Sequence, residues 1–281
     1  MTSAPPTSEG ADATVPKMII VPLDGSPFSE GAVPIAWKIA GRVGAHVLLM
    51  ATHFDDVDLE RRMKYLAAVA DRVAGDSIGS ISINEHPDAL VIEELLHDEP
   101  DRIVCMRSHG FGRLLWAVLG SVAEKVVRES RRPMLVVGRH CTEDWPSEMR
   151  HMVVCIDGSS VAHPIVPVAA HWATALGLDV HVAVVIHPLD FAGVGYPQDV
   201  VDAVVAQFVA LGVDAAPVVL HGAHTAGAIA DYAHEISAAL VAMSTHARGG
   251  LARAALGSVA MGTVGLVECP VLLAPMADHQ D

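Results

Sequence analysis

The chain carries one sequence pattern twice, with the same internal spacing in both halves. The pattern has three segments, and in each half nine residues separate the second segment from the third. The matched pairs are Val21–Ser26 with Val154–Ser159, Ser108–Gly110 with Thr245–Ala247, and Gly120–Ser121 with Gly257–Ser258. A repeated unit of about 130 residues predicts two successive domains of the same fold, each large enough to bury its own core.

Length and composition agree with two domains. A chain of 281 residues suggests about two units of roughly 100–200 residues each. We expect domains at 17–139 and 151–276, a linker at 140–150, and a disordered tail at 1–16 with no signal-peptide pattern. The chain is 52% hydrophobic but only 4% aromatic, which is typical of aliphatic side chains packed between a parallel sheet and its helices.

Strand and helix patterns alternate along each half. Short apolar runs predict strands near 18–23, 46–52, 80–84, 103–106 and 134–137, then near 152–156, 180–186, 216–220, 239–243 and 271–274. Helical spacing of apolar residues predicts helices near 29–43, 58–74, 87–98 and 121–130, then near 163–176, 199–211, 225–236 and 258–266. The alternation predicts an α/β fold with two Rossmann-like domains, each a five-stranded, mainly parallel sheet flanked by helices.

Charge and cysteine content argue against several classes of function. The net charge of −15 argues against a nucleic-acid-binding surface, which needs clustered Lys and Arg. The sequence has no uninterrupted run of 18 apolar residues, so we predict no transmembrane helix. The four cysteines form no CxxC pair, so we expect reduced, buried thiols in a cytoplasmic protein.

The repeated glycines have the features of an anion site. Gly110 follows a predicted strand, where a missing Cβ lets the backbone approach a ligand. Gly120 and Ser121 open a predicted helix, whose first N–H groups are unpaired and attract phosphate. A capping box from Ser121 to Glu124 would also explain this serine without any ligand. In the second half Met261 replaces the glutamate and the Gly-Ser pair remains, which favours the ligand.

Two other features leave alternatives open. Arg248 and Arg253 are the only Lys or Arg residues after position 150, and they indicate either a nearby anion or a solvated loop. Neither His221 with His224 nor His181 with His187 has a third ligand at a recognisable spacing, so we predict no metal site. No GxxxxGK[ST] motif and no nucleophile motif are found, so we predict neither a Walker A loop nor an enzyme.

The combined motif resembles the universal stress protein family in its tandem form, over residues 17 to 275. The resemblance rests on Asp24 after the first strand, on Met106-Arg-Ser-His-Gly110, and on Leu119-Gly-Ser-Val-Ala-Glu-Lys-Val nine residues later. It implies an ATP-binding regulator or sensor of stress responses, with or without Mg²⁺. No general base is visible in the sequence, so efficient hydrolysis is not expected, while slow hydrolysis stays open.

The resemblance also implies which residues bind the nucleotide. Asp24 would contact adenine or ribose, the backbone near Ala51 would meet adenine, and Gly110, Gly120 and Ser121 would hold the phosphates. The full expected first site is Asp24, Gly25, Ala51, Arg107, His109, Gly110, Gly120, Ser121 and Val122. The expected weaker second site is Asp157, Ile186, Ala247, Gly257, Ser258 and Val259.

The sequence departs from the family pattern in both halves. Arg107 stands where the family has its first glycine, so its side chain would either obstruct the crevice or pair with phosphate. In the second half Ser244 and Ala247 replace both early glycines, which predicts weaker binding there. The competing hypothesis is an interaction module with vestigial crevices and acidic surfaces that bind partners.

The last strand of each predicted sheet is short, apolar and uncharged. Exposed as edges, 134–137 and 271–274 would be prone to aggregation. In the family this strand pairs with its counterpart in a second chain, so the resemblance implies antiparallel pairing of the two strands within this chain. A further homodimer stays open.

Overall fold

The computed structural model describes residues 15–51, 59–74, 81–84, 99, 101–108, 132–142, 145, 150–157, 165–188, 198–245 and 257–275. The strands are β1 (Met18–Leu23), β2 (His46–Ala51), β3 (Ile81–Asn84), β4 (Arg102–Arg107), β5 (Met134–Val137), β6 (His151–Cys155), β7 (Asp179–Ile186), β8 (Ala215–His221), β9 (Leu240–Ser244) and β10 (Val271–Ala274). The helices are α1 (Pro27–Glu30), α2 (Val33–Val43), α3 (Leu59–Ala74), α6 (Ile165–Leu176), α7 (Gln198–Ala210), α8 (Thr225–Glu235) and α9 (Ser258–Leu266).

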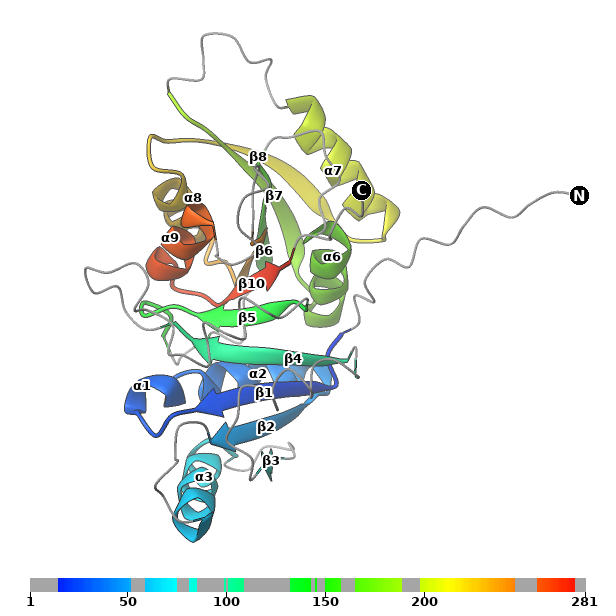
Figure 1. Ribbon diagram of the computed structural model, residues 1–281. Coiled ribbons are helices and arrows are strands. Elements are labelled where there is room, and N and C mark those ends of the chain that lie inside the picture. The colour runs from blue at the N-terminus through cyan, green and yellow to red at the C-terminus, as the bar shows by residue number, and fades with distance from the viewer. Residues whose placement is uncertain are drawn as a thin grey trace, which may run out of the picture.

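All these strands join one sheet in the order β3-β2-β1-β4-β5-β10-β9-β6-β7-β8 (Figure 1). Within each half the neighbouring strands are parallel. The two halves have the same strand order when each is read from its outer edge to the middle. The α/β fold with two parallel half-sheets is therefore confirmed, and the halves form one continuous sheet.

The halves meet where β5 pairs antiparallel with β10. Val136 lies opposite Val271, Leu135 opposite Leu272, and Met134 opposite Leu273. Both strands are buried along their whole length. The predicted pairing is confirmed, and each strand hides the edge that the other would otherwise expose.

The predicted helix at 29–43 is wrong as a single element. The structure has two helices there, α1 and α2, separated at Gly31 and Ala32. Pro34 lies in the first turn of α2, where its missing N–H would have no helical partner in any case. In one continuous helix the proline ring would instead clash with the carbonyl group of Glu30. The other described helices match their predicted positions closely, and the segments 87–98 and 121–130 lie outside the described residues.

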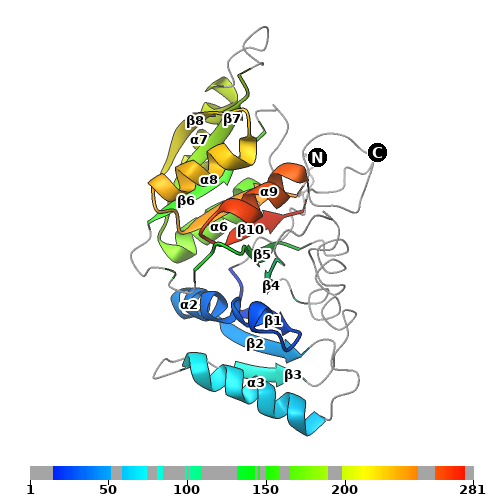
Figure 2. The same ribbon diagram turned by 90° about the vertical axis from the view of Figure 1, so that its left-hand side faces the viewer.

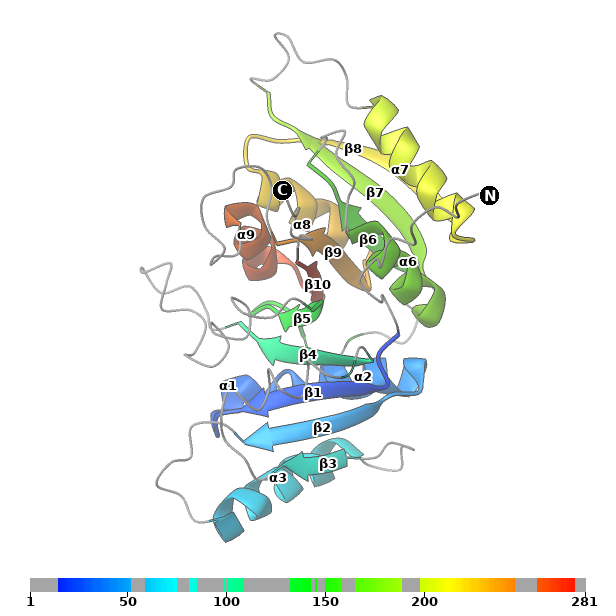
Figure 3. The same ribbon diagram turned by 45° about the vertical axis from the view of Figure 1, so that its right-hand side comes forward.

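Helices cover both faces of the sheet (Figures 2 and 3). On one face α2, α3, α6 and α7 bury aliphatic side chains in a core that continues across both halves. On the other face α8 and α9 cover the second half, within the part of the chain that is described. Since α2 from the first half packs against α6 from the second, the halves share helix contacts as well as strand pairing.

Trp145 of the expected linker lies between the two halves. Trp145 is buried, and its Nε1 donates a 2.8 Å hydrogen bond to the carbonyl oxygen of Ala239. The guanidinium of Arg42, from α2, lies 5.3 Å from the centre of the Trp145 ring. Trp145 therefore links a helix of the first half to a strand start in the second.

The four cysteines are free thiols. Burial raises the pKa of Cys141 and of Cys155 to about 12, so these thiols stay protonated near neutral pH and are poor nucleophiles. This agrees with the expectation of reduced thiols. None of the described helices is both long and apolar enough to cross a membrane.

Candidate functional site

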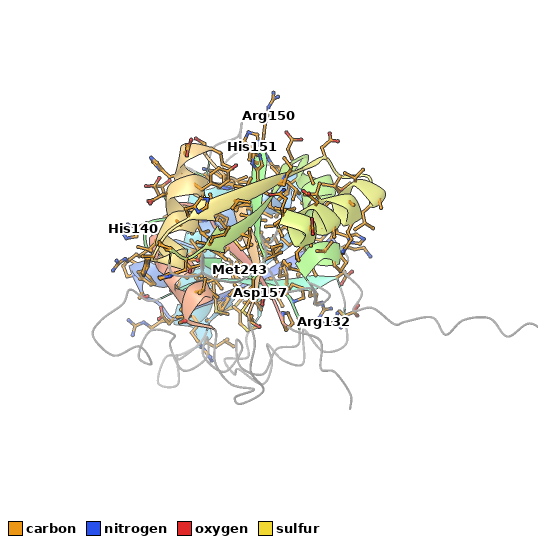
Figure 4. The ribbon with its side chains drawn as sticks, turned by 90° about the horizontal axis from the view of Figure 1, so that it is seen from above. Arg132, His140, Arg150, His151, Asp157 and Met243 are labelled. Atoms are coloured by element: carbon orange, nitrogen blue, oxygen red, sulfur yellow. The ribbon has the colours of Figure 1, made fainter. Side chains whose placement is uncertain are left out.

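Each half has a topological switch point at the carboxyl ends of its strands. In the first half β2 and β4 flank β1, and in the second half β7 and β9 flank β6. Ligands of open α/β sheets bind in the crevice at such a point. Asp24 follows β1 and Asp157 follows β6, so both aspartates lie at switch points, as predicted. Figure 4 labels Asp157, after the end of β6, and Met243 of the neighbouring strand β9. Met243 lies opposite Cys155, the last residue of β6.

A hydrogen-bonded turn holds Asp24 at the first crevice. One oxygen of its exposed carboxylate accepts bonds from the N–H of Ser26 at 2.9 Å and from the Ser26 hydroxyl at 2.6 Å. Gly25 has φ +81°, a left-handed conformation that favours glycine. The carboxylate is therefore oriented by the turn and remains open to solvent.

The same turn begins helix α1. The Ser26 hydroxyl accepts a bond from the N–H of Ser29, which makes Ser26 the N-cap. The Ser29 hydroxyl in turn accepts a bond from the N–H of Asp24 at 3.3 Å. Neither serine was predicted as part of the site. Ser26 followed by Pro27 is an N-cap and first-turn pattern that would have identified the cap.

Ala51 lies at the end of β2, directly opposite Leu23 at the end of β1. It is therefore beside the Asp24 turn, as the predicted adenine-side position requires. His109, Gly110, Gly120, Ser121 and Val122 of the expected first site, and Ala247 of the second, lie outside the described residues.

Arg107, at the end of β4, directs its guanidinium to the side of the sheet that α1 covers. The guanidinium donates to the carbonyl oxygens of Arg139 at 3.4 Å and Cys141 at 3.2 Å, and it lies 5.3 Å from the centre of the Phe28 ring. A Cβ built on Gly31 would overlap a terminal nitrogen of Arg107. Gly31 thus leaves the room that the arginine fills. The side chain joins β4, α1 and the start of the linker.

The second crevice is more fully described. Gly257 begins α9, and its N–H donates a 2.8 Å bond to the carbonyl oxygen of Thr245, just after β9. No side chain caps this helix, and Ser258 and Val259 are exposed. Among the described residues, the first amides of α9 therefore have no side-chain cap, as at the helix start of a phosphate site.

A side chain at Gly257 would be crowded, although the backbone conformation there does not need glycine. Its φ of −57° suits any residue, but a Cβ there would lie 3.2 Å from the Thr245 carbonyl oxygen. Ile186 ends β7, opposite His221 of β8, and is partly buried. The structure thus brings Asp157, Gly257 and Ser258 to one end of the second half-sheet.

Two of the histidines that were weighed as metal ligands, His181 and His224, have structural partners. Nδ1 of His224 accepts a bond from the N–H of Gly227 at 3.0 Å and caps α8. His181 lies between Tyr232 and His151. Among the residues that the structure describes, no group of three or more His, Cys, Asp and Glu is arranged to hold a metal ion.

Comparison with known proteins agrees with the duplicated architecture. The sequence profile of the universal stress protein family matches the chain twice, over residues 16–138 and 148–275. A universal stress protein from Archaeoglobus fulgidus DSM 4304 superposes with a TM-score of 0.68 at 17% identity, covering 93% of this chain and 99% of that one. A functionally unknown protein from Pseudomonas aeruginosa PAO1 superposes with a TM-score of 0.60 at 18% identity, covering 94% of each chain.

At these identities the superpositions establish a shared fold, and they extend over both halves of the chain. The two profile matches cover most of the sequence and coincide with the two half-sheets. The chain therefore belongs to the universal stress protein family, in its tandem form with two domains in one polypeptide.

Proposed function

We propose that this protein binds ATP, chiefly in its first domain, and regulates or senses a stress response in the cytoplasm without acting as an enzyme. The observation that carries this proposal is the Asp24 turn. It holds an exposed carboxylate at the switch point, beside the end of β2. A carboxylate in that position can accept hydrogen bonds from the ribose hydroxyls of a nucleotide, as an acidic residue does in other dinucleotide-binding folds.

The phosphates would lie at the expected helix start formed by Gly120 and Ser121. The counterpart in the second domain supports this assignment, because no described side chain caps the start of α9 beside Thr245. We expect Gly110, His109 and Val122 to complete the first site, with or without Mg²⁺ on the phosphates. Arg107 would act from behind the crevice, by holding α1 and the linker against β4.

The second domain would bind nucleotide more weakly. Ser244 and Ala247 stand where the family has its two early glycines, and the N–H of Gly257 is already bonded to the Thr245 carbonyl. This internal bond also favours the second hypothesis, in which the crevices are vestigial and the protein is an interaction module. The presence or absence of bound adenine nucleotide on the purified protein distinguishes the two hypotheses.

Titration calorimetry of the full chain with ATP tests the proposal. Gly120→Val is expected to weaken binding more than tenfold, a loss of over about 1.4 kcal/mol, because its side chain would fill the phosphate volume. Gly257→Val, the matched change in the second domain, is expected to leave most of the affinity. Circular dichroism of both variants shows whether they fold. A larger loss for Gly257→Val would reverse the ranking of the domains, and wild-type protein that takes up no adenine nucleotide would favour the interaction module.

A further inference from the structure

Three polar side chains form a chain of hydrogen bonds under helix α8. His181 of β7 lies between Tyr232 of α8 and His151 at the start of β6. Its Nδ1 is 2.6 Å from the Tyr232 hydroxyl, and its Nε2 is 3.2 Å from Nδ1 of His151. The two imidazole rings meet edge to face, with centroids 4.9 Å apart. All three residues are partly buried.

The three hydrogen-bonded side chains lie far from the second crevice, at the opposite end of the same half-sheet. His151 starts β6 and Asp157 follows the end of that strand, and Figure 4 labels both. Because both nitrogens of His181 face different partners, the three groups do not converge on one point where a metal ion could bind. The arrangement is a linear relay of hydrogen bonds.

The contact between the two histidines holds one proton. When either histidine carries the proton on the facing nitrogen and the other does not, one ring donates and the other accepts. When both are protonated, two N–H groups face each other across 3.2 Å and two positive charges repel. The three hydrogen-bonded side chains can thus accommodate one added proton, but a second added proton breaks the hydrogen bond between His151 and His181.

The surroundings set the balance of charge. Asp179 lies opposite His151 on β7, Glu235 lies on α8 near Tyr232, and Arg150 precedes His151. Ala216, opposite His181 on β8, and Leu240, opposite Met152 on β9, are not titratable. Burial, and secondarily His151, lowers the pKa of His181, while Asp179 acts in the opposite direction. Burial, and secondarily Glu235, raises the pKa of Tyr232, so this hydroxyl stays protonated.

Other histidines also hold α8. The N-cap bond of His224 needs an unprotonated Nδ1, because that atom accepts from Gly227. Near the other end, His234 is 3.0 Å from Glu268, a pair that protonation of the histidine would strengthen. This last pair is well exposed and therefore contributes little to stability.

Helix α8 in turn supports α9. The two helices pack closely, since a Cβ built on Gly262 of α9 would lie 2.9 Å from the Cβ of Ala226 in α8. Movement of α8 away from the sheet would therefore remove one side of the packing around α9. The start of α9 forms the second crevice, and Val264 of α9 packs against Gly138 of the first domain.

We propose that His151, His181 and Tyr232 form an acid-sensitive lock, which holds helix α8 against the sheet near neutral pH and loosens it when both histidines become protonated. The pH range follows from the lowered pKa of His181. In the unfolded chain a histidine gains its proton near its ordinary pKa of about 6.5. The lock therefore stabilises the fold fully above about pH 6.5, and this stability is lost as the pH falls toward the lower pKa of the folded state.

Hydrogen exchange of the full chain at pH 7.5 and 5.5 tests the lock. After correction for intrinsic exchange rates, the amides of α8 are expected to lose up to about tenfold in protection at the lower pH, because pH 5.5 lies about one pH unit below the ordinary histidine pKa of about 6.5. Helix α7 of the same domain, which lies on the other face of the sheet, is expected to change much less. An equal change in α7 and α8, or no change in α8, would overturn the proposal.

Two substitutions sharpen the test. His181→Gln keeps a neutral polar side chain and is expected to reduce the pH response of α8 to the part that the His224 cap contributes at the start of the helix. His171→Gln is the matched control, because His171 is an exposed histidine on α6 that bonds only the Pro167 carbonyl of its own helix, and it is expected to keep the full pH response. If His181→Gln does not fold, His151→Gln removes the same central contact. A pH response in the folded glutamine variant equal to that of the control contradicts the lock.

Histidine titration by NMR provides an independent readout on the wild-type protein. His181 is expected to gain its proton below the ordinary histidine range, because burial and the neighbouring His151 lower its pKa. A His181 ring that gains its proton in the ordinary histidine range would show that the folded structure does not disfavour its charged form, and would overturn the proposal.

Discussion

Gly138→Ala is expected to lower the free energy of unfolding by about 3 kcal/mol, at the upper end of the usual cost of overpacking a core. Gly138 is buried directly after β5, and a Cβ there would overlap the carbonyl oxygen of Val264 in α9 and lie 3.2 Å from its carbon. Both atoms belong to backbone, so no side-chain rotation can relieve the contact. Helix α9 would have to move away from the seam between the domains.

Gly41→Ala is the matched control for this change. Gly41 is exposed on α2, and a Cβ there would meet no atom within 4 Å. Since alanine is favoured over glycine in a helix, this variant is expected to gain about 0.5–1 kcal/mol. Denaturant unfolding followed by circular dichroism measures both changes. Equal stability of the two variants would show that α9 does not pack against Gly138 as closely as the structure indicates.

The sequence alone predicted the sheet well because its strands are continuous apolar runs. All ten predicted strands are present, and the repeat predicted that the second half would fold like the first. The strands and the duplication can be read directly from the chain. The pairing of β5 with β10 was predicted from the resemblance to the family, and it agrees with the need of an uncharged edge strand for a partner.

Contacts between distant residues were not predictable in the same way. Arg107 was expected at the crevice, yet its guanidinium bonds the carbonyl oxygens of residues 139 and 141, because Gly31 leaves room on the α1 side. His181 was considered with His187 as a weak metal candidate, whereas its partners are His151 and Tyr232, 30 and 51 residues away in sequence. No spacing rule relates these positions, since they meet only through the order of strands in the sheet.

Val136→Pro is expected to separate the two domains. Val136 is buried in β5, between Met106 of β4 and Val271 of β10. Proline has no N–H group and fits poorly inside a sheet whose strands pair on both sides. The loss of a ladder bond, with its partner left buried and unpaired, is expected to cost about 1–3 kcal/mol, and the proline ring adds a steric cost.

The test uses protein that has already folded as one chain. A protease site placed between Thr142 and Arg150 allows the linker to be cut, after which light scattering with gel filtration shows whether the halves remain together. Wild-type halves are expected to stay associated through β5 and β10 and through the contact of α2 with α6. Circular dichroism before cleavage confirms that each variant is folded.

Val136→Ala distinguishes the backbone effect from the loss of side-chain packing. Alanine removes two methyl groups but keeps the N–H group, so its cut halves are expected to remain associated at concentrations where those of Val136→Pro separate. The hydrogen bonds between β5 and β10 join the two half-sheets directly, whereas α2 and α6 contact each other on one face of the sheet only. If the proline variant stays associated as tightly as the alanine variant, the helix contact rather than the strand pairing holds the domains together.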